Sequence, residues 1–84
     1  MVVVENPQGL HARPAMRFVD TASQFQCRVI VRKGDSAVDG KNAIEMMLLE
    51  ATKGTELEIE VEGPDGDAAL DALEKLVKSG FGEA

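Results

Sequence analysis

His11 and Arg13 stand two positions apart at the start of a predicted helix, and their side chains are suited to handling phosphate. An imidazole is a nucleophile that forms covalent intermediates, and a guanidinium group makes bidentate hydrogen bonds to phosphate oxygens. First-turn helix amides have no intrahelical carbonyl partner, so together with the helix dipole they favour an anion. Ala12, Arg13 and Ala15 are expected to supply such amides, whereas Pro14 supplies none. These residues would therefore suit covalent transfer of a negatively charged group.

The same residues also have a simpler structural explanation. A histidine at a helix boundary can serve only as a capping residue, an arginine in the first turn is often solvated, and many helix termini hold no anion. No carboxylate is adjacent to His11 in the sequence to act as a general acid or base. From residue chemistry alone, the capping explanation is the commoner one and the phosphate site is the alternative.

Hydrophobic patterning predicts the elements that must position these side chains. Apolar residues recur at helical spacing in three segments and alternate or cluster as β-branched runs in four others. The clearest strand alternates Leu57, Ile59 and Val61 with glutamates. The predicted elements are a strand at 2–4, a helix at 12–24, strands at 28–33 and 36–38, a helix at 43–51, a strand at 56–62 and a helix at 68–81.

Turn and capping residues mark the boundaries of these elements. Gly34 and Asp35 form a hairpin signal between two antiparallel strands. Asn42 is a suitable N-cap for the second helix, Gly54 is the stop signal that follows this helix, and Asp67 is expected to cap the third. Helices this short bury their apolar stripes only by lying on one face of a sheet. The order βαββαβα therefore predicts one α+β domain over residues 1–84, built as a two-layer sandwich.

The second helix carries more apolar residues than one face can bury. At 3.6 residues per turn, Met46 and Leu49 point roughly opposite to Ile44, Met47 and Leu48. One set must then be exposed, unless the helix is buried on both sides. Surface-to-volume scaling in a chain of 84 residues favours exposure of one set.

Composition excludes several classes of function. The formal net charge is −6, so no broad cationic face is available for nucleic acid. The longest apolar run, 46–49, is far shorter than the roughly 20 residues that cross a bilayer, and no basic segment follows Met1. We therefore expect neither a nucleic-acid partner nor membrane insertion, and a cytoplasmic location. Cys27 is the only cysteine, which excludes an intramolecular disulfide and a thiolate metal site, and it is expected to be packed in a strand.

The stretch from Gly9 to Ala15, GLHARPA, closely resembles the active-site signature of HPr, the histidine-containing phosphocarrier family of the bacterial phosphotransferase system. The likeness continues through the following helix and through segments 38–41, 51–54 and 80–83, so it covers essentially the whole chain. It implies an open-faced sandwich, in which three helices cover one face of a four-stranded antiparallel sheet.

The resemblance also implies a relay. Enzyme I, charged by phosphoenolpyruvate, would phosphorylate His11 on Nδ1, and the IIA domain of a sugar permease would accept the phosphoryl group. Arg13 would orient the phosphate, and the amides of Ala12 and Arg13 would bind its oxygens. The protein would act as a monomer with no cofactor and no metal. It would be a covalent carrier and not a stand-alone enzyme, since no second catalytic group is in sight.

Matching positions in the family assign the two faces of the second helix. Met46 and Leu49 are expected in the core. The residues expected to dock on enzyme I and IIA proteins are Met16, Ile44, Met47 and Leu48. Exposed methionine is well suited to binding several partners.

Departures from the family pattern concern regulation and partners. Asn42 occupies the position at which many HPr proteins carry a kinase-phosphorylated serine, which implies that no regulatory serine is present and resembles the nitrogen-related branch. Asp20, Ser23 and Glu45 stand where lysines are frequent in enteric members, so complementarity with an acidic enzyme I is expected to be weaker. The alternative function is a binding-only regulator that docks through its second helix, but it would not require His11 and Arg13.

Overall fold

The computed structural model describes residues 1–82. Its elements are β1 (Val2–Val3), α1 (Ala12–Ala22), β2 (Arg28–Lys33), β3 (Ser36–Asp39), α2 (Ala43–Leu48), β4 (Glu56–Glu62), α3 (Gly66–Lys78) and a short 3₁₀ helix, η1 (Gly80–Gly82). The predicted order of strands and helices is confirmed. Residues 83–84 of the predicted domain lie outside the described residues, and they include Glu83 of segment 80–83, which resembles the family.

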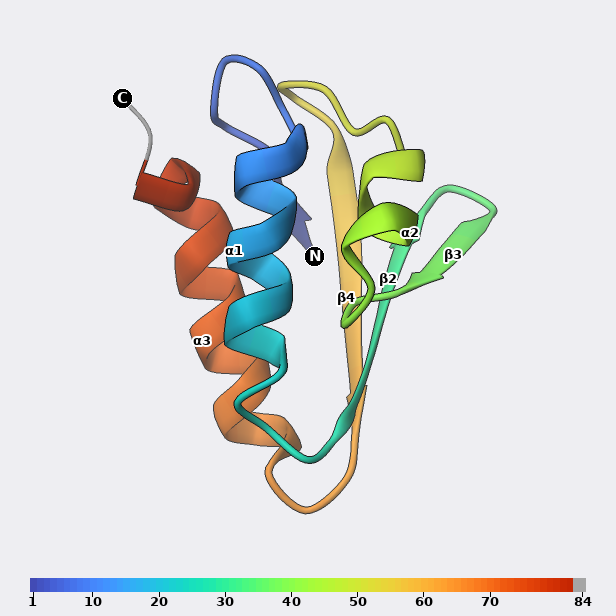
Figure 1. Ribbon diagram of the computed structural model, residues 1–84, viewed down its shortest axis with the longest axis vertical. Helices are drawn as coiled ribbons and strands as arrows, with labels where there is room; N and C mark the ends of the chain where they lie inside the picture. Colours follow the sequence, from blue (N-terminus) through green and yellow to red (C-terminus); the bar gives the residue numbers. More distant parts are fainter. Residues whose placement is uncertain (83–84) are drawn as a thin grey trace.

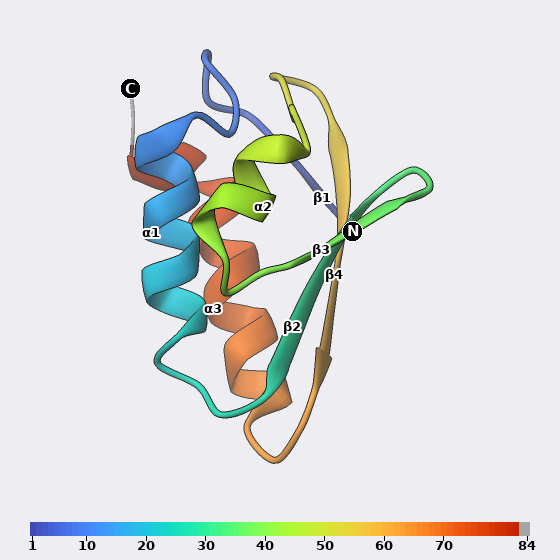
Figure 2. The same cartoon turned by 45° about the vertical axis from the view of Figure 1, so that its right-hand side comes forward.

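The four strands form one antiparallel sheet in the order β1-β4-β2-β3. Both ribbon views show the three helices on one face of this sheet, with the opposite face uncovered (Figures 1 and 2). The β2–β3 hairpin pairs Lys33 with Ser36, so the predicted turn consists of Gly34 and Asp35. Gly34 has a φ of 57°, which a glycine adopts at little cost. The open-faced α+β sandwich is therefore confirmed.

The core lies between the sheet and the helices because each element buries one face. Val29 and Val31 of β2 and Leu57 and Ile59 of β4 are buried, whereas the glutamates of β4 point to the uncovered face. The helices contribute fully buried side chains that include Phe18, Met46, Leu73 and Val77, and Phe81 of η1 joins them. Among residues 1–82, no helix has the length and apolar content needed to cross a membrane.

Two predicted helices end earlier than expected. The first stops at Ala22 and not at 24, because Gln24 and Phe25 bond to carbonyls three residues back and tighten the chain into turns. The second stops at Leu48 and not at 51. Glu50 has a φ of 53°, which is incompatible with a continuing right-handed helix.

The predicted capping role of Asp67 is wrong. The helix begins at Gly66, so Asp67 lies in its first turn and Asp65 takes the N-cap position without a side-chain capping bond. Both Asp65 carboxylate oxygens instead accept backbone amides across the fold, from Gln26 at 2.7 Å and from Cys27 at 2.9 Å. The last helix also ends at Lys78 and not at 81, and Phe81 lies beyond it with a φ of 59°.

Candidate phosphate site

His11 is the N-cap residue of α1, at the end of a loop that leaves β1. Its backbone is extended, with φ −79° and ψ −172°, and its carbonyl accepts the Ala15 amide at 3.0 Å to begin the helix. The imidazole makes no capping hydrogen bond. The explanation of His11 as a side-chain cap is therefore not supported, and the half-buried ring sits at the positive end of the helix dipole.

The first turn of α1 offers fewer amides than the sequence suggested. The Ala15 amide is already bonded to His11, which corrects the prediction that it faces an anion. Ala12 and Arg13 remain as first-turn positions whose amides lie outside the helical ladder, and both residues are exposed. The first turn holds no acidic side chain that would repel an anion. With the Arg13 guanidinium, this helix end is suited to binding phosphate oxygens.

The loop before His11 is fixed by contacts that sequence patterning did not reveal. The Leu10 amide donates to the Ala51 carbonyl at 2.8 Å, and the Asn6 side-chain amide donates to the Gly9 carbonyl at 2.6 Å. Gly9 has a φ of 69°, and a Cβ there would lie 2.3 Å from the Ala51 oxygen. Asn6 and Gly9 are typical turn-forming residues in the sequence, but no local pattern predicts that Gly9 and Leu10 contact residues 51 and 52.

The two faces of α2 separate as the family positions implied. Met46 is fully buried and Leu49 is 4% exposed, so both belong to the core as predicted. Ile44 and Leu48 are 68% and 71% exposed, which contradicts a helix buried on both sides. Met47 is half buried and packs against the core, so it offers less surface than expected.

Met16 completes the set of exposed apolar side chains on the two neighbouring helices. It lies on α1 and is 56% exposed. Helices α1 and α2 contact each other, and both views show them side by side (Figures 1 and 2). We define the docking patch as Met16, Ile44 and Leu48. Isolated exposed apolar residues are ordinary, but three large ones on adjacent helices are typical of an interaction surface.

Asn42 caps α2 as predicted. Its side-chain oxygen accepts the Glu45 amide at 3.1 Å, and its own backbone is extended. Glu45 in turn accepts the Asp39 amide at 3.2 Å. Asn42 therefore caps α2, but its amide side chain has no hydroxyl to phosphorylate.

Residues 1–79 match the family model described as the PTS HPr component phosphorylation site. The phosphocarrier protein HPr of Neisseria meningitidis serogroup A is 45% identical over 82 residues, which cover 98% of this chain and 92% of that relative. The phosphocarrier protein NPr of Proteus mirabilis is 36% identical over 83 residues, with the same coverage.

Among solved structures, HPr-C-His from Thermoanaerobacter tengcongensis superposes with a TM-score of 0.94 at 38% identity. The match covers 99% of this chain and 93% of that one. Sequence and fold thus agree over nearly the whole length. The chain therefore belongs to the HPr family of phosphocarriers of the phosphotransferase system.

Proposed function

We propose that His11 is the residue of this phosphocarrier that receives and passes on the phosphoryl group, through Nδ1. The observation that supports the proposal is the position of the imidazole. It stands at the N-terminus of α1 and is followed by the exposed Arg13. The nucleophilic imidazole, the permanently charged guanidinium of Arg13 and the backbone amides of Ala12 and Arg13 match the demands of phosphoryl transfer.

The proposed step exchanges one bond to phosphorus for another. The lone pair of the neutral His11 imidazole forms the new N–P bond, while the bond to the donor atom breaks and its electron pair returns to the donor. Arg13 and the amides of Ala12 and Arg13 would stabilise the charge on the equatorial oxygens. Delivery is the corresponding exchange with the acceptor: the acceptor atom forms a new bond to phosphorus, and the N–P bond breaks with its electron pair returning to His11. Because the phosphoryl group itself is the cargo, the reaction requires no cofactor and no metal.

Within the phosphotransferase relay, we assign enzyme I charged by phosphoenolpyruvate as the donor and a IIA protein as the acceptor. Both would dock on the patch formed by Met16, Ile44 and Leu48, with Met47 contributing at its edge. Docking by successive partners requires this patch to stay open, so we propose that the protein works as a monomer in the cytoplasm.

We further propose that this carrier lacks the serine switch of many relatives, since Asn42 retains the cap without a phosphorylatable hydroxyl.

The higher identity to the HPr-named relative than to the NPr-named one favours the sugar branch, whereas Asn42 favours the nitrogen-related branch. Phosphorylation rates with a purified enzyme I of each branch will distinguish them. An ATP-dependent HPr kinase should leave the chain unmodified, and phosphoserine at Ser36 or Ser79 would contradict our interpretation of Asn42.

The acceptor is tested by incubating the protein with phosphoenolpyruvate and enzyme I. We expect one phosphate, labile in acid and stable in base, on a peptide that contains His11. His11→Ala should fold, as judged by circular dichroism, and remain unmodified. Normal phosphorylation of His11→Ala would overturn the assignment. Absence of phosphate on the wild-type chain, together with stable binding to a partner through α2, would favour the binding-only alternative.

The role of Arg13 is tested by Arg13→Ala. Removal of one preorganised donor at a reacting centre typically slows the step by about 10²-fold, so we expect a loss of roughly that size in the transfer rate. Arg28→Ala is the matched control, because Arg28 is exposed on β2 and its removal changes the net charge equally. Equal rates for the two variants would show that Arg13 does not take part.

A further inference from the structure

We propose that Lys33 is a positioning residue for phosphoryl transfer, because its ammonium group fixes the backbone that supports the loop of His11. The inference rests on the proposed role of His11. It concerns a side chain at the C-terminal end of β2 that contacts the chain just after α2.

The Lys33 ammonium lies at the C-terminal end of α2. Its Nζ donates to the Leu49 carbonyl at 2.8 Å and to the Glu50 carbonyl at 3.3 Å. Lys33 is half buried and follows Val29 and Val31 on the face of β2 that points toward the helices. The last carbonyls of a helix have no amide partner within it and carry partial negative charge, so a cation is favourable there.

The two carbonyls that Lys33 holds lie at the point where the chain leaves α2. Glu50 has a φ of 53°, a left-handed conformation that is costly for a residue with a Cβ. Such a conformation persists only when its surroundings fix it. The charged hydrogen bonds from Lys33 on either side of this turn supply that constraint and determine where Ala51 lies.

Ala51 carries the constraint to the loop of His11. It is 2% exposed, and its carbonyl accepts the Leu10 amide at 2.8 Å. The backbone of Gly9 packs so closely against Ala51 and Thr52 that no side chain fits between them. Gly9 in turn accepts the His11 amide at 3.0 Å. Movement of residue 51 would therefore displace the backbone from which the imidazole projects.

The same clamp acts on the docking surface. Ile44 and Leu48 lie on α2, one end of which Lys33 holds. A partner bound to the docking patch would therefore meet the imidazole at a fixed offset from the patch, because Lys33 supports both α2 and the loop of His11. Phosphoryl transfer depends steeply on the alignment of the reacting atoms, so this offset matters for rate.

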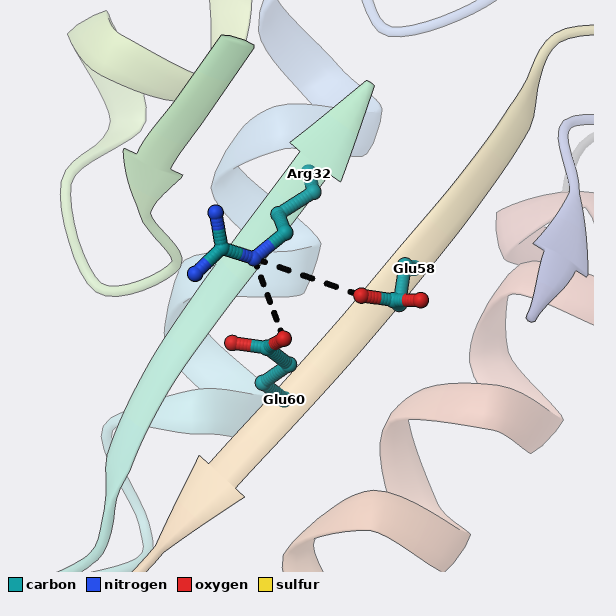
Figure 3. Close-up of polar contacts among 3 residues, drawn as sticks. All are labelled: Arg32, Glu58 and Glu60. Atoms are coloured by element: carbon teal, nitrogen blue, oxygen red, sulfur yellow. Dashed lines mark ion pairs between the residues drawn. The ribbon is translucent and has the colours of Figure 1, made fainter. Parts of the chain in front are cut away.

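The test compares Lys33→Met with Arg32→Met. Methionine keeps the apolar stem and removes the ammonium group. Arg32 is the adjacent residue, and Figure 3 shows it on the uncovered face, where its Nε lies 3.0 Å from Glu60 and 4.0 Å from Glu58. Both variants lose one positive charge from the same strand, but only Lys33→Met releases the end of α2.

Two measurements separate positioning from general destabilisation. Hydrogen exchange of the Leu10 amide, relative to that of Val31 in the sheet, should be about tenfold faster in Lys33→Met and unchanged in Arg32→Met. The transfer rate at saturating donor should fall about tenfold in Lys33→Met and stay within about twofold in Arg32→Met. Lys33→Arg should restore most of the rate, because a guanidinium also donates to these carbonyls.

Unchanged exchange at Leu10, or equal rates for Lys33→Met and Arg32→Met, would overturn the inference. The exchange measurement uses unphosphorylated protein, so it reports on the clamp independently of the chemistry. Normal phosphorylation of His11→Ala would instead refute the proposed acceptor, whatever the exchange result.

Discussion

Replacement of Gly9 by alanine perturbs the phosphate site through a backbone contact. Gly9 has a left-handed φ of 69°, and a Cβ built on it would lie 2.3 Å from the Ala51 oxygen and 2.9 Å from the Thr52 Cα. Both obstacles are backbone atoms, which cannot rotate away as a flexible side chain can. The loop must therefore move away from residues 51 and 52, and His11 moves with it.

The expected size of the effect follows from two terms. An L-residue in the left-handed region costs about 1–2 kcal/mol. Separating the loop far enough to relieve the contact, roughly 1 Å, also weakens the Leu10 hydrogen bond to Ala51, which contributes about 0.5–1.5 kcal/mol. We expect Gly9→Ala to lower the free energy of unfolding by about 1.5–3.5 kcal/mol. A displacement of about 1 Å at a reacting group should slow transfer by up to about 10²-fold.

The assay pairs urea unfolding with phosphorylation by enzyme I under conditions in which each variant is fully folded. Gly34→Ala is the matched control, since Gly34 also has a positive φ but no atom lies within 4 Å of its would-be Cβ. The control should show the conformational cost alone, with an unchanged transfer rate. The reasoning is refuted if Gly9→Ala loses no more stability than Gly34→Ala and transfers phosphate as fast as the wild type.

Three further predictions concern groups elsewhere in the fold. Amide hydrogen bonds from Gln26 and Cys27 lower the pKa of Asp65 below 3.8. The stabilising contribution of this carboxylate is therefore present above that value and is lost as the pH falls through the folded pKa. In urea unfolding at decreasing pH, Asp65→Asn should lose less unfolding free energy on acidification than the wild type. Burial raises the pKa of the Cys27 thiol, so a thiol reagent at neutral pH should label it slowly in the native state and rapidly in urea, and rapid native labelling would contradict this. Asn42→Ala should lower the unfolding free energy by about 1 kcal/mol, whereas Asn42→Ser should keep the cap to Glu45 and stay near the wild type.

Periodicity predicted the elements well because each element buries one face. The alternation of Leu57 and Ile59 with glutamates and the hairpin signal at Gly34 follow from local geometry, and both the strand and the hairpin formed where predicted. The signature around His11 likewise indicated the family before any contact was known. Residue chemistry alone did not decide between a capping and a phosphate-binding role for that histidine.

Helix ends and capping partners were predicted less well, because competing tertiary contacts decide them. Asp65 and Asp67 are equivalent in local sequence terms. The start of the helix at Gly66 and the need of the Gln26 and Cys27 amides for an acceptor determine their different roles. The early stop of α2 likewise coincides with the left-handed Glu50, where Lys33 of β2 donates to the Leu49 carbonyl from a distant part of the chain.

The amino-acid sequence by itself determined the order of elements, the presence of a histidine and an arginine at a helix start, and the surplus of apolar residues on the second helix. Those properties depend on periods of 2 and 3.6 residues and on side-chain chemistry, which are local. Only the tertiary structure decided how far Met47 turns into the core and which backbone supports the loop of His11. The contacts of Gly9 with Ala51, and of Lys33 with Leu49, join residues far apart in the chain, so no local pattern encodes them.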